Sequence, residues 1–332
     1  MSLIASPIRF VSVVYTDLTD FIKYEISKFI DVIVSQYEKP LNMSLSKTEC
    51  GYAFGAGDSL AAALAAQYLS SLRFLAIDPL SLVIYISRSC AGRKSALAIS
   101  YKGKTREVVK SAERLRSFGW RVVAITSNPR SPLALAANDV VEVINTGEKL
   151  PIGMSSFVAT ITAIAKLVGA KVSTDILKSQ LNNVLAREIE VRGLPSTRGI
   201  NEVIAVGEGS GLVPAYFLCL KLHEVLCMPC RVYPLEEFLH APIYSISRST
   251  LTVVYPSERT NKASSLISIL SKLGVPYVMV KHESTCYANI ISGIIQGLKL
   301  LLKLVAEFNV KTPCYRDKKV LVNISTPLIY FT

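Results

Sequence analysis

The stretch that decides the fold is Gly51-Tyr-Ala-Phe-Gly-Ala-Gly-Asp-Ser59, in which a short apolar run enters a glycine turn and then an Ala- and Leu-rich segment. A second stretch of the same kind, Val203-Ile-Ala-Val-Gly-Glu-Gly-Ser-Gly211, leads into another Leu-rich segment. Strand, glycine turn and helix in that order open a parallel α/β unit. Two such openings predict two units related by internal duplication.

Outward from these turns, short β-branched runs alternate with helical stretches, as in a doubly wound parallel sheet. In the first unit we expect strands at 51–55, 74–77, 96–100, 121–126 and 140–143, and helices at 59–72, 105–118 and 155–168. In the second we expect strands at 203–207, 231–233, 251–255 and 277–281, and helices at 212–226, 261–273 and 288–308. A helix near 17–37 precedes them, and a helix at 174–190 connects them. The fold class is therefore α/β, with an N-terminal helical segment at 1–45, units at 46–170 and 201–332, and a connector at 171–200.

Composition excludes several classes of protein. Of 332 residues, 50% are hydrophobic and 19% are charged, which excludes disordered and fibrous chains. The mean hydropathy is +0.38, but lysines interrupt the longest apolar stretches, 153–169 and 287–308. No signal-peptide pattern begins the chain, so we expect a cytoplasmic protein without a membrane span. The net charge of +12 comes from scattered side chains, which favours a small anionic ligand over nucleic acid.

The cysteines predict no disulfide framework. Seven is an odd number, and the chain shows no secretion signal. Cys227 and Cys230 have the CxxC spacing, but no second Cys or His pair lies at zinc-finger distance. We interpret them as buried thiols, and we expect no metal and no cofactor.

Two loops are candidate ligand sites. Gly55 and Gly57, with Asp78 about 20 residues on, permit a dinucleotide interpretation, but Leu60 stands where the third glycine belongs. The loop Ser100-Tyr-Lys-Gly-Lys-Thr105 combines hydroxyls, lysines and a helix start, which together form an anion cradle. Its Gly-Lys-Thr ending is typical of ATP-binding loops, yet that motif requires a glycine at position 98, which is alanine.

A third region carries candidate proton-transfer groups. Lys221 and Glu224 are three residues apart, so they share one face of the helix that follows the second glycine turn. His240 follows sixteen residues after Glu224. A helix carboxylate and a histidine are typical partners in acid–base catalysis.

On these residues the chain resembles the double SIS (sugar isomerase) domain family, in particular the isomerase part of glutamine–fructose-6-phosphate aminotransferase. The family's catalytic helix reads LKLKE, and here it is Leu220-Lys-Leu-His-Glu224. The family's ELKHGP resembles Glu237-Phe-Leu-His-Ala-Pro242, and Lys318 follows a proline at the family's distance. The phosphate loop SxSGxT corresponds to 100–105, and the first glycine loop to 57–59.

The resemblance implies two flavodoxin-like domains and a phosphosugar bound mainly by the first. It assigns the sugar phosphate to seven residues: Gly57, Asp58, Ser59, Ser100, Tyr101, Lys102 and Thr105. Glu224, on the same helix face as Lys221, moves a proton between C1 and C2 through an enediol. His240, from the neighbouring subunit of a homodimer, opens the sugar ring, and Lys318 stabilises the oxyanion or holds the C-terminal tail over the site.

The departures from the family concern the substrate. No glutaminase domain is seen, so glutamine is not expected as the nitrogen source within this chain. Tyr101 replaces a glutamine, Lys102 a serine, and Asp58 a threonine or serine. We expect an isomerase of a hexose 6-phosphate or amino-hexose 6-phosphate, including amination or deamination with ammonia; the alternative is a non-catalytic phosphosugar sensor.

Overall fold

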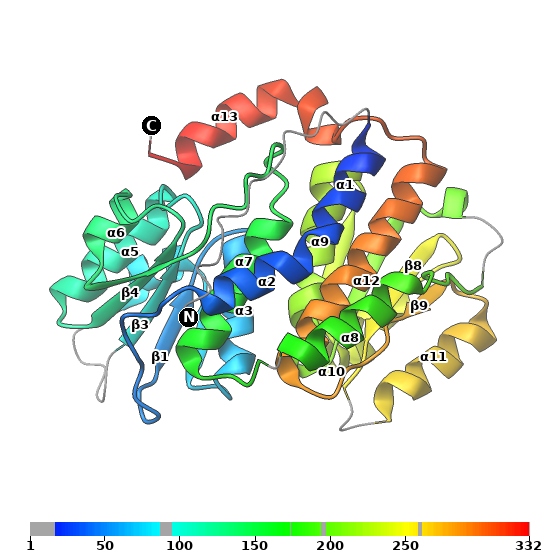
Figure 1. The fold of residues 1–332 in the computed structure, drawn as a ribbon. Helices are drawn as coiled ribbons and strands as arrows, with labels where there is room; N and C mark the ends of the chain where they lie inside the picture. The colour runs from blue at the N-terminus through cyan, green and yellow to red at the C-terminus, as the bar shows by residue number, and fades with distance from the viewer. Residues whose placement is uncertain (1–16, 87–94, 173, 194–196, 258–260, 332) are drawn as a thin grey trace, which may run out of the picture.

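The structure, a computed structural model, describes residues 17–86, 95–172, 174–193, 197–257 and 261–331. Two parallel sheets lie on either side of a central group of helices (Figure 1). This arrangement confirms the predicted α/β class. The first 16 residues of the expected N-terminal segment lie outside the described residues.

The first sheet has five parallel strands in the order β2-β1-β3-β4-β5. Its strands are β1 (Gly51–Phe54), β2 (Phe74–Ile77), β3 (Ser95–Ile99), β4 (Arg121–Thr126) and β5 (Asp139–Glu142). Its helices are α3 (Asp58–Leu69), α4 (Pro79–Tyr85), α5 (Arg106–Ser117), α6 (Pro132–Ala136) and α7 (Ser155–Val168). The strand order reverses direction between β1 and β3, where open α/β sheets bind ligands.

The second sheet repeats this order with four described strands, β7-β6-β8-β9. They are β6 (Glu202–Gly207), β7 (Cys230–Pro234), β8 (Thr250–Tyr255) and β9 (Tyr277–Met279). The helices are α9 (Leu212–Leu226), α10 (Leu235–His240), α11 (Lys262–Leu273) and α12 (Cys286–Glu307), with short 3-10 turns η1 (Thr197–Gly199), η2 (Gly209–Gly211) and η3 (Pro242–Ser245). Beyond them, η4 (Cys314–Asp317) leads into α13 (Lys319–Ile329), which crosses above both halves (Figure 1).

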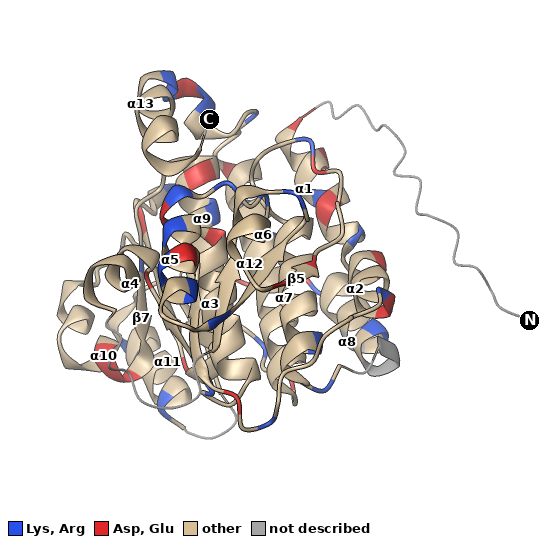
Figure 2. Cartoon of the chain, turned by 90° about the vertical axis from the view of Figure 1, so that its left-hand side faces the viewer, with Lys and Arg blue, Asp and Glu red and all other residues tan. Residues whose placement is uncertain are grey.

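The interior explains the long apolar runs of the sequence. Leu97 and Ile99 of β3 face the central helices, whereas Ala96 and Ala98 face the outer layer of α4, α5 and α6. Both faces of the sheet are therefore buried, as parallel sheets require. Figure 2 shows charged residues of both signs on outer helices such as α5, while α3 is almost without them. Helices α3 and α7 pack with α9 and α12 into one core shared by both halves.

The N-terminal helix differs from the prediction. The segment expected as a single helix at 17–37 is two helices, α1 (Leu18–Ser27) and α2 (Phe29–Glu38), with Lys28 between them. Lys28 is nearly buried, and its ammonium group binds Glu25 and the carbonyl of Thr146. The connecting helix, α8 (Thr174–Ala186), is shorter than expected.

Helix α12 is long and apolar enough to cross a membrane, judged by length and composition alone. However, 83% of its most apolar stretch is buried inside the protein. Gly293 allows it to approach α9, since a Cβ there would lie 2.7 Å from a ring atom of Pro214. These contacts are those of a core helix.

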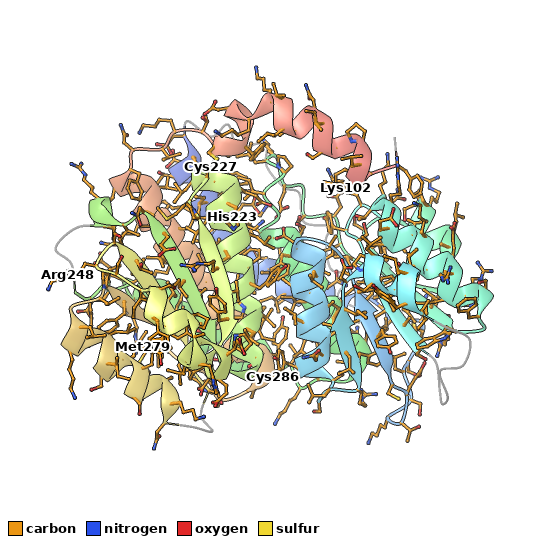
Figure 3. The ribbon with its side chains drawn as sticks, turned by 180° about the vertical axis from the view of Figure 1, so that it is seen from behind. Lys102, His223, Cys227, Arg248, Met279 and Cys286 are labelled. Atoms are coloured by element: carbon orange, nitrogen blue, oxygen red, sulfur yellow. A yellow bond between two sulfur atoms is a disulfide. The ribbon has the colours of Figure 1, made fainter. Side chains whose placement is uncertain are left out.

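The cysteine prediction was wrong. Cys219 is paired with Cys230, and Cys227 with Cys314, so the two CxxC cysteines belong to different disulfides. The first disulfide joins α9 to β7. The second joins the C-terminal end of α9 to η4, just before α13 (Figure 3).

Candidate active site

A cavity of about 670 Å³ opens at the carboxyl ends of β1 and β3, where the strand order reverses. It is walled by the loops after these strands, the segment between β5 and α7, helix α9 and the C-terminal tail. Of the predicted residues, eight line it: Gly57, Asp58, Ser59, Ser100, Tyr101, Lys102, Thr105 and Glu224. The structure thus brings together all the predicted sugar-phosphate residues and the predicted base.

The loop 100–105 forms a tight turn ahead of α5. The Ser100 hydroxyl lies 3.0 Å from that of Thr105, and the amide of Gly103 donates to the Ser100 carbonyl at 2.9 Å. Gly103 has a φ of +66°, and a Cβ there would lie 2.0 Å from the Ser131 hydroxyl, so the turn requires glycine. Two hydroxyls at a helix N-terminus are suited to a phosphate group.

Tyr101 is fixed as a wall of the cavity. Its phenol donates to the carbonyl of Ile144 at 3.1 Å and accepts the amide hydrogen of Thr146 at 3.2 Å. Its own carbonyl accepts from the hydroxyl of Ser127 at 2.7 Å. Burial raises the pKa of the phenol, so Tyr101 keeps its proton. It connects the loop 100–105 to the segment between β5 and α7.

On the opposite wall, Asp58 and Glu224 line the cavity, and the fully buried Lys221 lies between them without lining it. The Lys221 Nζ lies 2.9 Å from Oδ2 of Asp58 and 2.7 Å from Oε2 of Glu224, and it also donates to the carbonyl of Ile152. This contact confirms that Lys221 and Glu224 share a helix face. Burial opposes the charge of Lys221, but the two carboxylates raise its pKa, so it remains a cation.

The geometry of this wall depends on a glycine. Gly153 has a φ of +64°, and a Cβ there would lie 2.3 Å from Oδ2 of Asp58. Any larger residue would push the Asp58 carboxylate away from Lys221. The sequence did not reveal this constraint, because Asp58 begins α3 and lies far from Gly153 along the chain.

The two carboxylates hold protons more tightly than usual. Burial raises the pKa of Asp58 to about 7; Lys221 opposes the rise, and Glu224 adds to it. Burial also raises the pKa of Glu224, against the effect of Lys221. A carboxyl group that titrates near neutral pH, as Asp58 does, is suited to proton transfer.

Glu148 is a wall residue that the sequence did not reveal. Its Oε1 accepts the amide hydrogens of Met154 at 2.7 Å and Ser156 at 2.8 Å, and Oε2 accepts the Ser156 hydroxyl hydrogen at 2.7 Å. These contacts satisfy backbone N–H groups at the start of α7, which have no partner within the helix, and they engage both oxygens of the carboxylate. Its charge also raises the pKa of Asp58 and Glu224.

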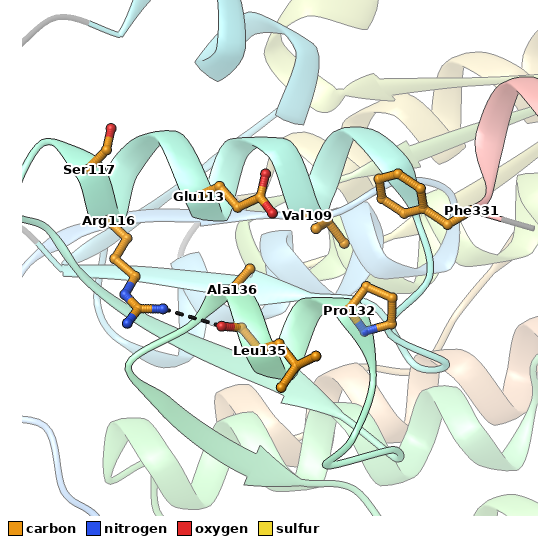
Figure 4. A pocket seen from close by; sticks show the side chains of 8 residues that line it. All are labelled: Val109, Glu113, Arg116, Ser117, Pro132, Leu135, Ala136 and Phe331. Atoms are coloured by element: carbon orange, nitrogen blue, oxygen red, sulfur yellow. Dashed lines mark hydrogen bonds between the residues drawn. The ribbon is translucent and has the colours of Figure 1, made fainter.

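The C-terminal tail closes one side of the cavity. Tyr330 lines it and pairs with Thr105 in an antiparallel bridge, and the Phe331 amide donates to the Lys104 carbonyl at 3.0 Å. The Phe331 ring lies in a groove of about 820 Å³ between α5 and α6, beside Val109 and Pro132 (Figure 4). Tyr330 was not predicted, because nothing in its local sequence indicates that it reaches this cavity.

Two predicted residues lie elsewhere in this chain. His240 ends α10, has an exposed side chain and lies 3.7 Å from Glu236. Figure 1 places α10 at the opposite end of the second half from α13, so His240 and Glu224 lie near opposite ends of α9, a helix of roughly 20 Å. Lys318 is exposed before α13 and does not line the cavity. Figure 3 shows Lys102 beneath α13 and His223, next to Glu224, at the upper end of α9.

Among the residues that the structure describes, no group of three His, Cys, Asp or Glu side chains is arranged to hold a metal ion. The polar groups of the cavity divide into a loop with hydroxyls and lysines and a wall with Asp58 and Glu224, which the buried Lys221 joins from behind. The first suits an anion, and the second suits proton transfer to and from carbon and oxygen.

Comparison with known proteins finds similarity to a domain family and to sugar-phosphate enzymes. The family model of the SIS domain matches residues 50–170, a range that contains all five strands of the first sheet. Over 209 residues, 58% of this chain, the sequence is 26% identical to the isomerizing glutamine–fructose-6-phosphate aminotransferase of Pyrobaculum aerophilum. That match covers 35% of the relative, so the chain spans about a third of its length.

Solved structures share the fold of nearly the whole chain. A glucosamine-6-phosphate deaminase from Thermotoga maritima has a TM-score of 0.65 at 17% identity, covering 86% of this chain and 95% of its own. Tagatose-6-phosphate ketose/aldose isomerase from Escherichia coli has a TM-score of 0.68 at 16% identity, covering 90% and 97%. The C-terminal domain of glucosamine-fructose-6-phosphate aminotransferase from Francisella tularensis has a TM-score of 0.65 at 16% identity, covering 88% and 97%.

Proposed function

We propose that the chain is a sugar-phosphate isomerase that moves a proton between C1 and C2 of an open-chain hexose 6-phosphate or amino-hexose 6-phosphate, with ammonia as a further reactant where the sugar carries nitrogen. The observation that carries the proposal is the single cavity in which the loop 100–105 faces the Asp58–Lys221–Glu224 wall. The SIS match and the sugar-phosphate enzymes of the same fold support it.

In this proposal the first half holds the phosphate. Ser59, Ser100 and Thr105 donate hydrogen bonds to it, and Lys102 supplies positive charge from the exposed side of the loop. The start of α5 favours the same anion. Fixing the phosphate orients the sugar so that its first carbons reach the opposite wall.

Glu224 is the proposed base. A carboxylate of raised pKa takes the proton from the carbon next to the carbonyl and returns it to the neighbouring carbon, which commonly contributes about 10²–10⁴-fold to a rate. Lys221, fully buried in its ion pairs, fixes the direction of the Glu224 carboxylate and stabilises negative charge that develops on the sugar oxygens.

The second half is proposed to be a second SIS domain, since its strand order repeats that of the first. We also propose a homodimer in which His240 of one subunit opens the ring of the sugar bound by the other. Its exposure supports this role, because a histidine so far from Glu224 in its own chain is free to face a partner. Lys318 is proposed to stabilise the oxyanion or to hold the C-terminal tail over the site.

The test of the function is proton exchange, followed by NMR in deuterated buffer. Fructose, glucose, mannose and glucosamine 6-phosphates are added in turn, with and without ammonium. Deuterium at C1 or C2 of one sugar is expected and identifies the substrate. Binding without exchange for all four would refute the isomerase and favour the phosphosugar sensor.

The dimer is tested by complementation. Glu224→Gln and His240→Asn proteins should each be inactive alone. Mixing and subunit exchange should restore turnover, because one site of each mixed dimer then has both groups. A monomer by light scattering with full activity would contradict the shared site.

A further inference from the structure

The proposed reaction moves two kinds of proton, and the residues assigned so far move only one. Glu224 serves the carbon-bound proton. Conversion of an aldose into a ketose also requires a proton to reach O1 and another to leave O2. A second acid–base group must therefore contact the sugar oxygens within the cavity.

Most polar groups at the wall are already committed. Lys221 donates to Asp58, Glu224 and Ile152, which uses all three of its protons. Glu148 accepts from the start of α7 through both oxygens. Tyr330 has a pKa raised by burial and by both nearby carboxylates, so it releases its proton reluctantly.

Asp58 is the group that remains. Its Oδ2 binds Lys221, while its Oδ1 is buried and has no hydrogen-bond partner among the described residues. An unpaired buried carboxylate oxygen is costly unless it holds a proton or meets a donor from a ligand. Asp58 lines the cavity, and it is separated from Glu224 by the Lys221 ammonium group, which contacts both carboxylates.

We propose that Asp58 is a second catalytic residue, which carries protons between O1 and O2 of the sugar while Glu224 serves the carbons. The inference rests on the proposed function. Because Asp58 belongs to the same chain as Glu224, this task needs no group from a partner subunit. The ring-opening role of His240 is a separate step.

The protons and electrons balance over the cycle. Glu224 takes the C2 proton as Asp58 gives its proton to O1; the C2–H pair forms the C1=C2 bond, and the carbonyl pair becomes the O1–H bond. Asp58 then takes the O2 proton as Glu224 returns its proton to C1, which leaves a carbonyl at C2. Both residues end in their starting states.

The cycle starts with protonated Asp58 and ionised Glu224. The pKa of about 7 for Asp58, raised first by burial, leaves a large protonated fraction at neutral pH. Turnover should fall at high pH as Asp58 ionises, and at low pH as Glu224 is protonated, giving a bell-shaped profile. The charged and titratable groups around Asp58 are Lys221, Glu224, Glu148, Tyr330, Lys102 and Lys104.

The test is Asp58→Asn, which keeps the size and can still accept from Lys221. We expect turnover and C2 deuterium exchange to fall about 10²–10³-fold, the high-pH limb near pH 7 to vanish, and the Kd for the sugar phosphate to stay within a factor of three. Asp139→Asn, which alters a carboxylate paired with Arg121 outside the cavity, is the control and should match the wild type.

Asp58→Ala is the second variant, with formate added as a small replacement acid. Turnover that rises with formate supports a proton-transfer role, which a merely structural residue would not show. Wild-type turnover with an unchanged high-pH limb in Asp58→Asn, or lost turnover without formate rescue, would overturn the inference. Wild-type turnover in Glu224→Gln would instead overturn the proposed function.

Discussion

The two glycine loops of this molecule share a sequence pattern and a topology but differ in what surrounds them. The loop after β1 opens into the 670 Å³ cavity and contributes Gly57, Asp58 and Ser59 to its lining. The side chains of the loop after β6 instead form hydrogen bonds within the second half. The Glu208 carboxylate accepts from the amide of Ser257 at 2.8 Å, and the Ser210 hydroxyl accepts from the Asn289 side chain at 3.1 Å.

The difference teaches how two halves with the same strand order can serve two purposes. A Cβ on Gly211 would lie 2.7 Å from the Tyr255 carbonyl, so the second loop approaches its own sheet closely. The second half contributes instead through the far end of the helix that follows its loop, where Lys221 and Glu224 meet Asp58. The first half lines the cavity with its loops, and the second half lines it with the end of a helix.

The largest expected effect is the loss of the base. Glu224→Gln keeps the shape but cannot accept a proton, so turnover of the sugar phosphate should fall about 10²–10⁴-fold. The measurement is the steady-state rate with the substrate identified by NMR. A rate within threefold of the wild type would show that the helix end plays no chemical part.

The next effect is on stability. Lys221→Met removes the cation between two carboxylates, and breaking a buried ion pair from one side costs about 3–5 kcal/mol. Urea unfolding should show this loss, and the pKa values of Asp58 and Glu224 should rise, since Lys221 holds both down. Adding Asp58→Asn should recover part of the loss; an unchanged unfolding midpoint in Lys221→Met would contradict the ion pairs.

The two loops are compared directly by hydroxyl removal. Ser100→Ala should weaken binding of the sugar phosphate about tenfold or more, because a hydrogen bond to a charged group contributes about 1.5–3 kcal/mol. The matched change Ser210→Ala, in the second loop, should leave the affinity unaltered. Calorimetric titration measures both, and equal losses would remove the distinction between the halves.

The smallest effect concerns the glycine beside Asp58. Gly153→Ala should cost about 1–2 kcal/mol in unfolding free energy and reduce turnover, because the new Cβ meets Oδ2 of Asp58. Gly169 has a similar positive φ but open space around it, so Gly169→Ala should lower the unfolding free energy and leave turnover unchanged. Equal turnover in the two variants would show that Asp58 tolerates displacement.

Local chemistry predicted much of this structure. The strands Phe74–Ile77 and Arg121–Thr126 and the helices Ser155–Val168 and Leu212–Leu226 were predicted with their observed bounds. These segments have apolar runs between clear breakers. The break at Lys28 was missed, since it involves neither glycine nor proline and depends on buried contacts of its side chain.

The site was predictable as a set of residues but not as a network. Spacing alone placed Lys221 and Glu224 on one helix face. The contact of Asp58 with Lys221 joins residues 163 positions apart, and hydrophobic periodicity cannot predict a contact at that separation. The prediction of unpaired cysteines was wrong for the same reason. Cys227 pairs with Cys314, which is distant in the sequence, and not with Cys230 of the CxxC spacing.

The disulfide between Cys227 and Cys314 has a consequence for the topology of the chain. It closes a covalent ring whose ends are 87 positions apart and which contains β7, β8, β9 and α12. When the protein is stretched by its ends, this ring cannot lengthen, so the unfolded contour is shorter by nearly that many residues until a thiol opens it. A single protease cut inside the ring would leave both fragments joined, and they would separate only under reducing conditions.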